Sequence, residues 1–312
     1  MSGSRESFPR PAGGSPAEGQ PRPRPCAVAG TFYPADPGRL AGLVDQLLEE
    51  AAGRARPASL SPDSVVGALV PHAGLVYSGA IAALTWLLVG EIVPSTIVLA
   101  GTDHQAWADG IGVWTGGPWE TPLGQVPVDR DLAMRIAGLG GHFAADNDAH
   151  LTEHSLEVQL PLLARVCPGA RIVPLAVSPR LTAHVEAGAQ LGRLLANLRS
   201  AGERVLLVAS SDLAHYPPAQ ICEEVDELLL EPLLDMDGEA LDELDEDIVR
   251  SGRPGLVCGL CGIDPVRFTL AALAEMGATR GYLLGKATSA DAGGDPHRTV
   301  GYAAAAFTRS PD

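Results

Sequence analysis

Three stretches of this sequence each place a histidine shortly after an apolar run. ALVPHAG carries His72, IVLAGTDH carries Asp103 and His104, and LLVASSDLAH carries Asp212 and His215. If these runs are strands of one open α/β sheet, the residues that follow them meet at its carboxyl edge, where such sheets bind ligands. Imidazoles beside carboxylates favour iron, zinc, copper or nickel over magnesium or calcium. A metal-free histidine network that transfers protons is the alternative.

Two cysteines offer the further ligand that would favour a metal. Cys258 and Cys261 lie in the stretch CGLCGIDP, which opens an expected helix over 264–277. A thiol at the start of a helix has a lowered pKa, which favours the metal-binding thiolate. The C-x-x-C spacing is weak by itself, because the chain has no second pair for a zinc ribbon and no thioredoxin-like context. We therefore expect a structural or incidental role for Cys258.

A further histidine lies in the stretch TEHSLEVQLP. It contains His154 and Glu157, three residues apart and hence on one side of a helical turn. Pro161 limits how far a regular helix extends upstream, so the pair is expected in the entry loop and first turn. The pair either orients a ligand or shuttles protons, or it caps the helix, and the sequence supports the functional and the capping role equally. The remaining histidines lack partners at informative spacing and are expected at the surface: His142, His150, His184 and His297.

The charge of the chain limits its partners. The 312 residues include 38 acidic and 22 basic side chains, a formal net charge of -16. Because nucleic-acid binding needs a basic face, we expect no nucleic-acid partner. Thirteen of the acids lie in 223–247, which has no Lys or Arg, so the acidity is mostly local. We expect a solvated helix face there, with cation binding as the less favoured alternative, and an inward face of Val225, Leu228, Leu229, Leu233 and Leu234.

The location of the protein is inferred from what the sequence lacks. No apolar run approaches the roughly 20 residues that cross a bilayer, so we expect no membrane partner. The first 25 residues lack the apolar core of a secretory signal. An odd and sparse set of cysteines argues against a disulfide scaffold, and we expect thiols at Cys26, Cys167, Cys222, Cys258 and Cys261. A cytoplasmic location is the resulting expectation.

The apolar pattern alternates β-branched runs with helix-like stretches. This is typical of an α/β fold with a central, largely parallel sheet flanked by helices. No linker or internal repeat interrupts the pattern, so we expect one domain over 26–309 after a disordered Pro/Gly/Arg-rich tail over 1–25. The expected strands are 65–70, 96–100, 111–115, 171–177, 204–209, 281–286 and 299–307, and the expected helices are 38–53, 79–90, 129–139, 156–167, 183–199, 222–236, 238–250 and 264–277.

Taken in order, the motifs of this chain resemble those of the MEMO family. They are AGTFYP, PHAGLVYSG, GTDH, TPLG with a following VD, EHSLEVQLP, SSDLAHY, CGIDP and VGYAAAAF, and together they span 27–308. Each motif is weak alone, but eight in order are specific. The MEMO family is in turn similar to the class III extradiol dioxygenases, so the resemblance implies that fold, in which Fe(II) is held by two histidines and a carboxylate.

The resemblance also implies a set of site residues. His72, His104 and Cys261 match the metal ligands of the family, and Pro265 sets the register of the cysteine. It implies further residues that line the same site, and we assign catalytic roles to Asp212, His215 and His154. The chain departs from the family at two places: Gln105 follows His104 where many relatives have a second histidine, and Ile263 and Asp264 replace more basic residues. These changes alter the surroundings of the metal and put anion recognition at the helix start in doubt.

Three functions are compatible with these residues. The first is a metal-dependent oxidoreductase with Fe(II) or copper, in which His215 moves a proton and Asp212 holds its tautomer or completes the metal shell. A thiolate softens the metal and is itself oxidisable, which argues against ordinary catechol cleavage. The second, implied by the resemblance, is a non-catalytic accessory protein that binds a metal, small molecule or peptide and acts with AMMECR-type and radical-SAM proteins. The third is zinc-dependent hydrolysis.

Overall fold

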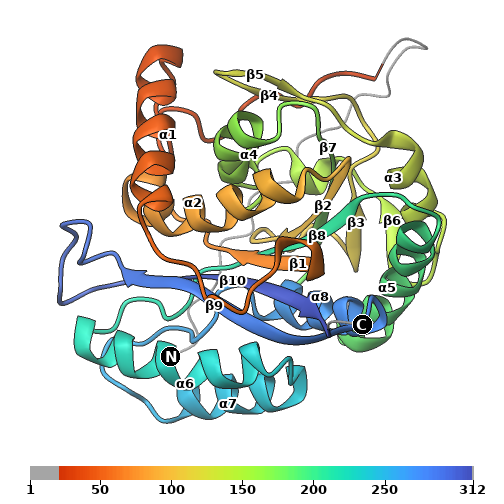
Figure 1. The fold of residues 1–312 in the computed structure, drawn as a ribbon. Coiled ribbons are helices and arrows are strands. Elements are labelled where there is room, and N and C mark those ends of the chain that lie inside the picture. Colours follow the sequence, from red (N-terminus) through yellow and green to blue (C-terminus); the bar gives the residue numbers. More distant parts are fainter. Residues whose placement is uncertain (1–20, 311–312) are drawn as a thin grey trace.

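Eight strands form one mixed sheet within residues 21–310, which are the residues that the structure, a computed structural model, describes (Figure 1). Their order is β6-β3-β7-β2-β8-β1-β10-β9, and a separate hairpin pairs β4 with β5. The strands are β1 Val65–Val70, β2 Thr96–Thr102, β3 Ile111–Val113, β4 Trp119–Thr121, β5 Gly124–Val126, β6 Phe143–Ala145, β7 Arg171–Val177, β8 Val205–Ser210, β9 Ala278–Thr288 and β10 Gly301–Arg309.

Four neighbouring strands at the centre of the sheet are parallel. β7, β2, β8 and β1 pair in parallel, whereas β10 and β9 continue one side of the sheet in antiparallel fashion. On the other side, β3 is antiparallel to β7 and parallel to β6. The predicted α/β fold with a central, largely parallel sheet is therefore confirmed, with antiparallel strands added at both edges.

Helices cover both faces of the sheet, and the strand residues alternate between them. Ile97 and Leu99 of β2 pack in the core beneath α1, α2 and α4, whereas Val98 and Ala100 pack in the core beneath α3, α5, α6, α7 and α8. The same period of two holds along β8, where 205, 207 and 209 face one core and 206 and 208 face the other. The helices are α1 Pro37–Ala52, α2 Leu75–Ile92, α3 Arg130–Ala137, α4 Leu160–Val166, α5 His184–Ser200, α6 Ala219–Leu234, α7 Gly238–Arg250 and α8 Ile263–Glu275.

The expected segments differ from the structure mainly at short elements. The expected helix over 156–167 is a short 3₁₀ turn, Glu157–Gln159, followed by α4, since Pro161 restricts the backbone where the two meet. The β4–β5 hairpin and β6 have three residues per strand and are missing from the expected strands, because such short strands carry too little alternation to recognise.

The expected disordered tail over 1–25 extends too far at its carboxyl end. Arg24 is fully buried, and its backbone N–H donates to the carbonyl of Pro118 at 2.8 Å. The Pro- and Arg-rich composition suggests a solvated segment, but buried acceptors satisfy this guanidinium, so it can leave water. Residues 1–20 of the expected tail lie outside the described residues.

One helix of the described residues, α2, is long and apolar enough to cross a membrane by length and composition. However, 61% of this helix is buried inside the protein, where it packs against α1, α4, β9 and β10. Such burial is typical of the core helix of a globular domain, which passes the same test. The cytoplasmic location stays a prediction.

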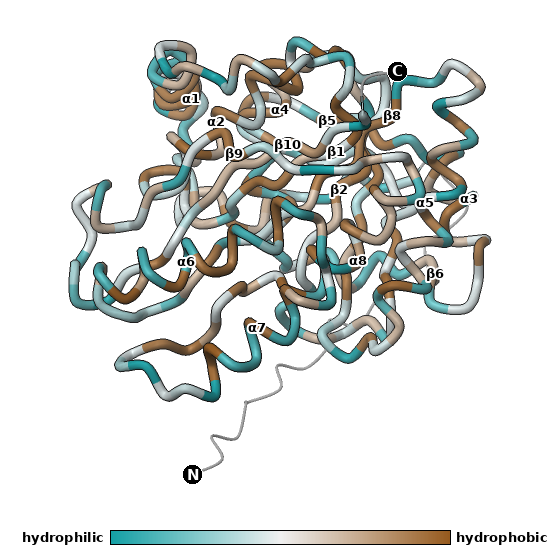
Figure 2. Tube along the Cα trace, turned by 60° about the horizontal axis from the view of Figure 1, so that its bottom comes forward, coloured by the Kyte–Doolittle hydropathy of each residue, from teal (hydrophilic) through white to brown (hydrophobic). Residues whose placement is uncertain are grey.

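The acidic stretch forms most of α6 and α7, along which hydrophilic and hydrophobic residues alternate (Figure 2). Val225, Leu229 and Leu233 are buried as expected, but Leu228, expected inside, is 42% exposed because it lies on the outer side of α6. Two acids of the stretch are buried rather than solvated. Both hold backbone amides of loops that are described next.

Candidate metal centre

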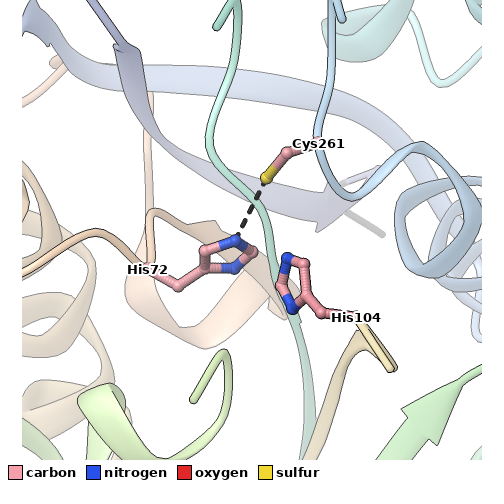
Figure 3. Close-up of side chains that lie close together, drawn as sticks. All are labelled: His72, His104 and Cys261. Carbon is pink, nitrogen blue, oxygen red and sulfur yellow. Dashed lines mark hydrogen bonds between the residues drawn. The ribbon is translucent and has the colours of Figure 1, made fainter. Parts of the chain in front are cut away.

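Three neighbouring central strands bring the candidate residues to one edge of the sheet. His72, Asp212 and His104 each lie two residues beyond the last residue of β1, β8 and β2, respectively. Cys261 reaches the same place from the loop that precedes α8. One ligand atom from each of His72, His104 and Cys261 lies within 4.8 Å of the others (Figure 3). The structure thus brings together the three residues that the sequence analysis assigns as ligands.

Hydrogen bonds set the tautomer of His72. The hydroxyl of Ser210 donates to the carbonyl of Ser155 at 2.7 Å and accepts from the Gln159 amide at 3.0 Å. It is therefore an acceptor toward Nδ1 of His72, which lies 3.2 Å away and must carry the proton. Burial lowers the pKa of His72 to about 3. The ring is neutral, and the lone pair of Nε2 faces Cys261 Sγ at 3.1 Å.

A buried carboxylate sets the tautomer of His104 in the same way. Glu153 Oε1 accepts from Nδ1 of His104 at 2.9 Å, and Oε2 accepts from its backbone N–H at 2.9 Å. Burial acts to lower the pKa of His104, but the hydrogen bond and charge of Glu153 outweigh it and raise the pKa. The pKa of Glu153 is correspondingly held well below its usual range, although burial alone would raise it. A carboxylate behind a ligating histidine orients the ring and makes Nε2 more basic.

Cys261 corrects one expectation from the sequence. Burial and the charge of Asp212 raise the pKa of its thiol well above the usual value, whereas a helix start was expected to lower it. Cys261 lies two residues before α8, so it does not gain the effect of the helix N-terminus, and burial dominates. The positive charge of a metal ion lowers the pKa of a coordinated thiol, so that the thiol is deprotonated. A bound ion would therefore lower the pKa of Cys261, which the helix does not do.

Asp212 forms hydrogen bonds with the loop of His72 but none with the ring of His215. Its Oδ1 accepts from the backbone N–H of His72 at 2.6 Å and of Ala73 at 3.2 Å. Its Oδ2 lies 3.8 Å from Nε2 of His215, which exceeds a hydrogen bond. Among the described residues that nitrogen is buried without a hydrogen-bond partner. Asp212, His215 and Cys261 form a second cluster of potential ligands within 4.8 Å of one another.

His154 lies at the site, but Glu157 does not. The His154 ring stacks on His104 with 4.4 Å between centroids and contacts Phe32 at 4.6 Å. Its side chain is 24% exposed, and burial lowers its pKa. Glu157 instead binds Arg24 and accepts from the backbone of 27–28. Only His154 of the pair is therefore placed to contact a ligand. Glu157 does not lie at the site, and it caps no described helix.

Comparisons with known proteins give the family of the chain. The family model described as Memo-like protein matches residues 24–306. The chain belongs to the Memo-like family. A MEMO1 family protein of Ignicoccus hospitalis is 36% identical over 293 residues, which cover 91% of this chain and 98% of that protein. One of Methanothermobacter thermautotrophicus is 36% identical over 284 residues, which cover 89% and 97%.

A comparison with solved structures finds an uncharacterized protein from Escherichia coli K12. It has a TM-score of 0.45 and 17% identity, and the match covers 77% of this Memo-like chain and 99% of that chain.

Four residues that support the site of this Memo-like protein were not predicted from the sequence. Glu153 and Ser210 bind the candidate ligand histidines, and Glu153 could have been found as the carboxylate next to His154 in the same motif. The other two come from the acidic stretch. Asp226 accepts from the N–H of Ala214 at 3.0 Å, and Asp245 accepts from the N–H of Leu260 at 2.8 Å.

Both carboxylates hold the loops of site residues. Asp226 binds Ala214, which precedes His215, and Asp245 binds Leu260, which precedes Cys261. Burial raises the pKa of Asp226 to about 7 and that of Asp245 to about 6. The acidic stretch therefore supports the site loops in addition to covering the surface.

Two histidines expected at the surface are buried. His150 is fully buried between Trp114 and Trp119, and its Nε2 bonds the carbonyl of Gly112 at 2.9 Å. His184 is 5% exposed, and its Nε2 lies 3.0 Å from Asp264. Their polar neighbours in sequence suggested exposure, but residues distant in the chain enclose them. His297 is exposed as expected, and His142 is half-buried.

Proposed function

We propose that this protein is a metal-dependent oxidoreductase whose ion is bound by His72, His104 and Cys261. The observation that carries the proposal is that both histidines are held by their Nδ1 atoms, through Ser210 and Glu153. Each therefore offers the lone pair of Nε2, the atom by which imidazole commonly binds a metal. A cysteine sulfur completes a set whose ligand atoms are within 4.8 Å of one another.

The donor set fits iron(II) or copper, and zinc is also compatible. Two neutral imidazoles and a thiolate are soft to borderline ligands, unlike the oxygen ligands that magnesium and calcium prefer. When bound, the ion would supply Lewis acidity and, for iron or copper, one-electron chemistry. The site therefore suits redox chemistry better than the binding of a hard cation.

Residues around the ligands would handle protons and substrate. His215 is 20% exposed with a buried Nε2 that has no hydrogen-bond partner among the described residues, so it can take or give a proton at that atom. Asp212 accepts from the backbone N–H of His72, so its carboxylate fixes the His72 loop. His154 stacks on His104, and its side chain is 24% exposed.

The proposal is tested by purifying the protein without oxygen and measuring its bound metal. We expect close to one equivalent of iron or copper and metal-dependent oxygen consumption with a reductant. Zinc as the bound metal, with ester hydrolysis and no oxygen consumption, would favour the hydrolytic alternative. Protein that retains none of these metals after reconstitution would contradict the proposal.

Metal affinity should rise with pH across the neutral range. Because the pKa of the Cys261 thiol is well above its usual value, each bound ion must displace one proton. The apparent dissociation constant should then fall about tenfold per pH unit. His72 adds no proton there, since its pKa is about 3, but the raised pKa of His104 steepens the dependence at the acidic end. Chelator competition between about pH 6.5 and 8.5 measures the slope, and a flat profile would exclude a thiolate ligand.

We also propose a peptide or protein partner at the site entrance, with AMMECR-type and radical-SAM proteins as the candidates that the family resemblance implies. Large apolar side chains are exposed beside the site loops: Val76 is 62%, Tyr77 45% and Val257 62% exposed. Val257 donates its N–H to the carbonyl of His215. Exposed large apolar side chains beside a site are candidates for an interface with a partner. Co-expression with neighbouring genes and co-purification test this proposal, and charged substitutions at Val76 and Val257 should abolish any complex.

A further inference from the structure

The guanidinium of Arg24 is fully buried beside the loop that carries Glu153 and His154. Its Nε donates to the carbonyl of His150 at 2.7 Å, and Nη2 donates to the carbonyl of Glu153 at 2.7 Å. Nη1 forms an ion pair with Glu157, and the group lies 4.0 Å over the ring of Trp119. All three nitrogens of the fork are thus engaged, and two of them bind the loop itself.

This loop connects Arg24 to the candidate ligand His104. The guanidinium holds the backbone carbonyl of Glu153, and the side chain of Glu153 binds both Nδ1 and the N–H of His104. The same carboxylate accepts from the N–H of His154 at 2.8 Å and of Ser155 at 2.8 Å. A shift of the Glu153 backbone would therefore move the carboxylate that sets the tautomer of His104.

Glu157 does not depend on Arg24 alone for its hydrogen bonds, so pairing with Glu157 is not the whole role of the arginine. It is already bound by the N–H groups of Ala27 and Val28 and by the hydroxyl of Tyr33 at 2.6 Å. Those contacts anchor the amino-terminal segment. Among the described residues, only Arg24 links that segment to the carbonyls of 150–153 by side-chain hydrogen bonds. A lysine would supply the charge but could not reach three acceptors in a fixed planar arrangement.

We infer that Arg24 is a positioning residue of the metal centre. It makes the amino-terminal segment part of the site by fixing Glu153, and through it the orientation of His104. The inference rests on the proposed function, because it concerns the same ligands. It differs from a purely structural role in that weakening the Arg24 contacts changes metal coordination in protein that is still folded.

The test uses Co(II), whose visible bands report ligand type and geometry, with the full-length protein and the variant Arg24→Lys. Lysine keeps a positive charge opposite Glu157, so the variant should fold. We expect about tenfold weaker Co(II) binding, as for other groups that hold a metal ligand, together with shifted d–d bands. Arg24→Gln should show the same shift more strongly wherever it remains folded by circular dichroism.

Two variants serve as controls. Arg22→Gln changes an exposed arginine two residues away and should leave the Co(II) spectrum and affinity as in wild type. Tyr33→Phe removes a hydrogen bond to Glu157 without touching 150–153, so it should lower stability but not change the spectrum.

Two outcomes separate the inference from the proposed function. If wild-type protein binds no Co(II), the metal site itself is wrong. If wild type binds Co(II) and Arg24→Lys gives the same bands and a dissociation constant within about twofold, Arg24 does not position the site and the inference is overturned. A spectral shift in Tyr33→Phe equal to that in Arg24→Lys would also overturn it. A general loss of stability in the amino-terminal segment would then explain both shifts.

Discussion

Replacing Cys261 with alanine should abolish tight metal binding while leaving the fold intact. The sulfur is one of three candidate ligands and faces Nε2 of His72 at 3.1 Å. Removing a group that only orients a ligand costs about 10–100-fold in metal affinity, so the loss of a direct ligand should exceed 100-fold. The sulfur-to-metal charge-transfer band of the Co(II) form should disappear, and the thermal unfolding of the metal-free protein should change little.

The neighbouring cysteine provides a matched control. Cys258 belongs to none of the clusters of potential ligands among the described residues, and its backbone carbonyl accepts from the N–H of His215. Cys258→Ala should therefore keep full metal content and the charge-transfer band. If the two variants lost metal equally, the pair would act as a unit and the assignment of Cys261 alone would fail.

The ligand-bearing edge could be predicted because its residues follow strands with strong apolar patterns. His72, His104 and Asp212 come directly after β1, β2 and β8, and parallel strands necessarily bring such positions to one edge. Cys261 does not follow a strand, so its place at the same edge could be expected only from the resemblance to a family. The resemblance does not predict which metal binds, because that depends on the affinity of the site and on the availability of each metal.

The supporting residues could not be predicted from local patterns. Glu153 binds a histidine 49 positions earlier, and Arg24 binds a carbonyl 126 positions later. Neither spacing carries a periodic signal, because both contacts arise from the packing of loops that are distant in the sequence. The buried His150 is missed for the same reason: its polar sequence neighbours say nothing of the two tryptophans that enclose it.

The contacts of Arg24 also show why composition misjudged the amino-terminal boundary. A segment rich in proline and arginine is normally solvated, because burying a charge without partners is costly. Here Glu157 supplies the opposite charge, and loop carbonyls take the remaining donors. The resulting cluster joins 24–33 to 150–157, so stability and site geometry depend on the same buried pair.

Replacing Glu157 with alanine should consequently lower the free energy of unfolding by about 3–5 kcal/mol. The substitution leaves the guanidinium of Arg24 buried without a counter-charge, since both side chains are fully buried. It also leaves the N–H groups of 27–28 and the hydroxyl of Tyr33 without their acceptor. Urea unfolding of the metal-free protein measures the change, which keeps it separate from any loss of metal binding.

An exposed ion pair elsewhere in the chain serves as the comparison for this buried pair. Glu91 also binds an arginine, Arg56, at 2.8 Å, but the two side chains are 49% and 40% exposed. Water and salt screen that pair, so Glu91→Ala should cost no more than about 1 kcal/mol. Both substitutions remove one glutamate from one arginine, but only Glu157→Ala takes it from a buried site and also removes the acceptor of the 27–28 N–H groups and of Tyr33. Equal losses in the two variants would mean that water reaches Arg24, and the buried cluster could then not hold the loop of Glu153 in place.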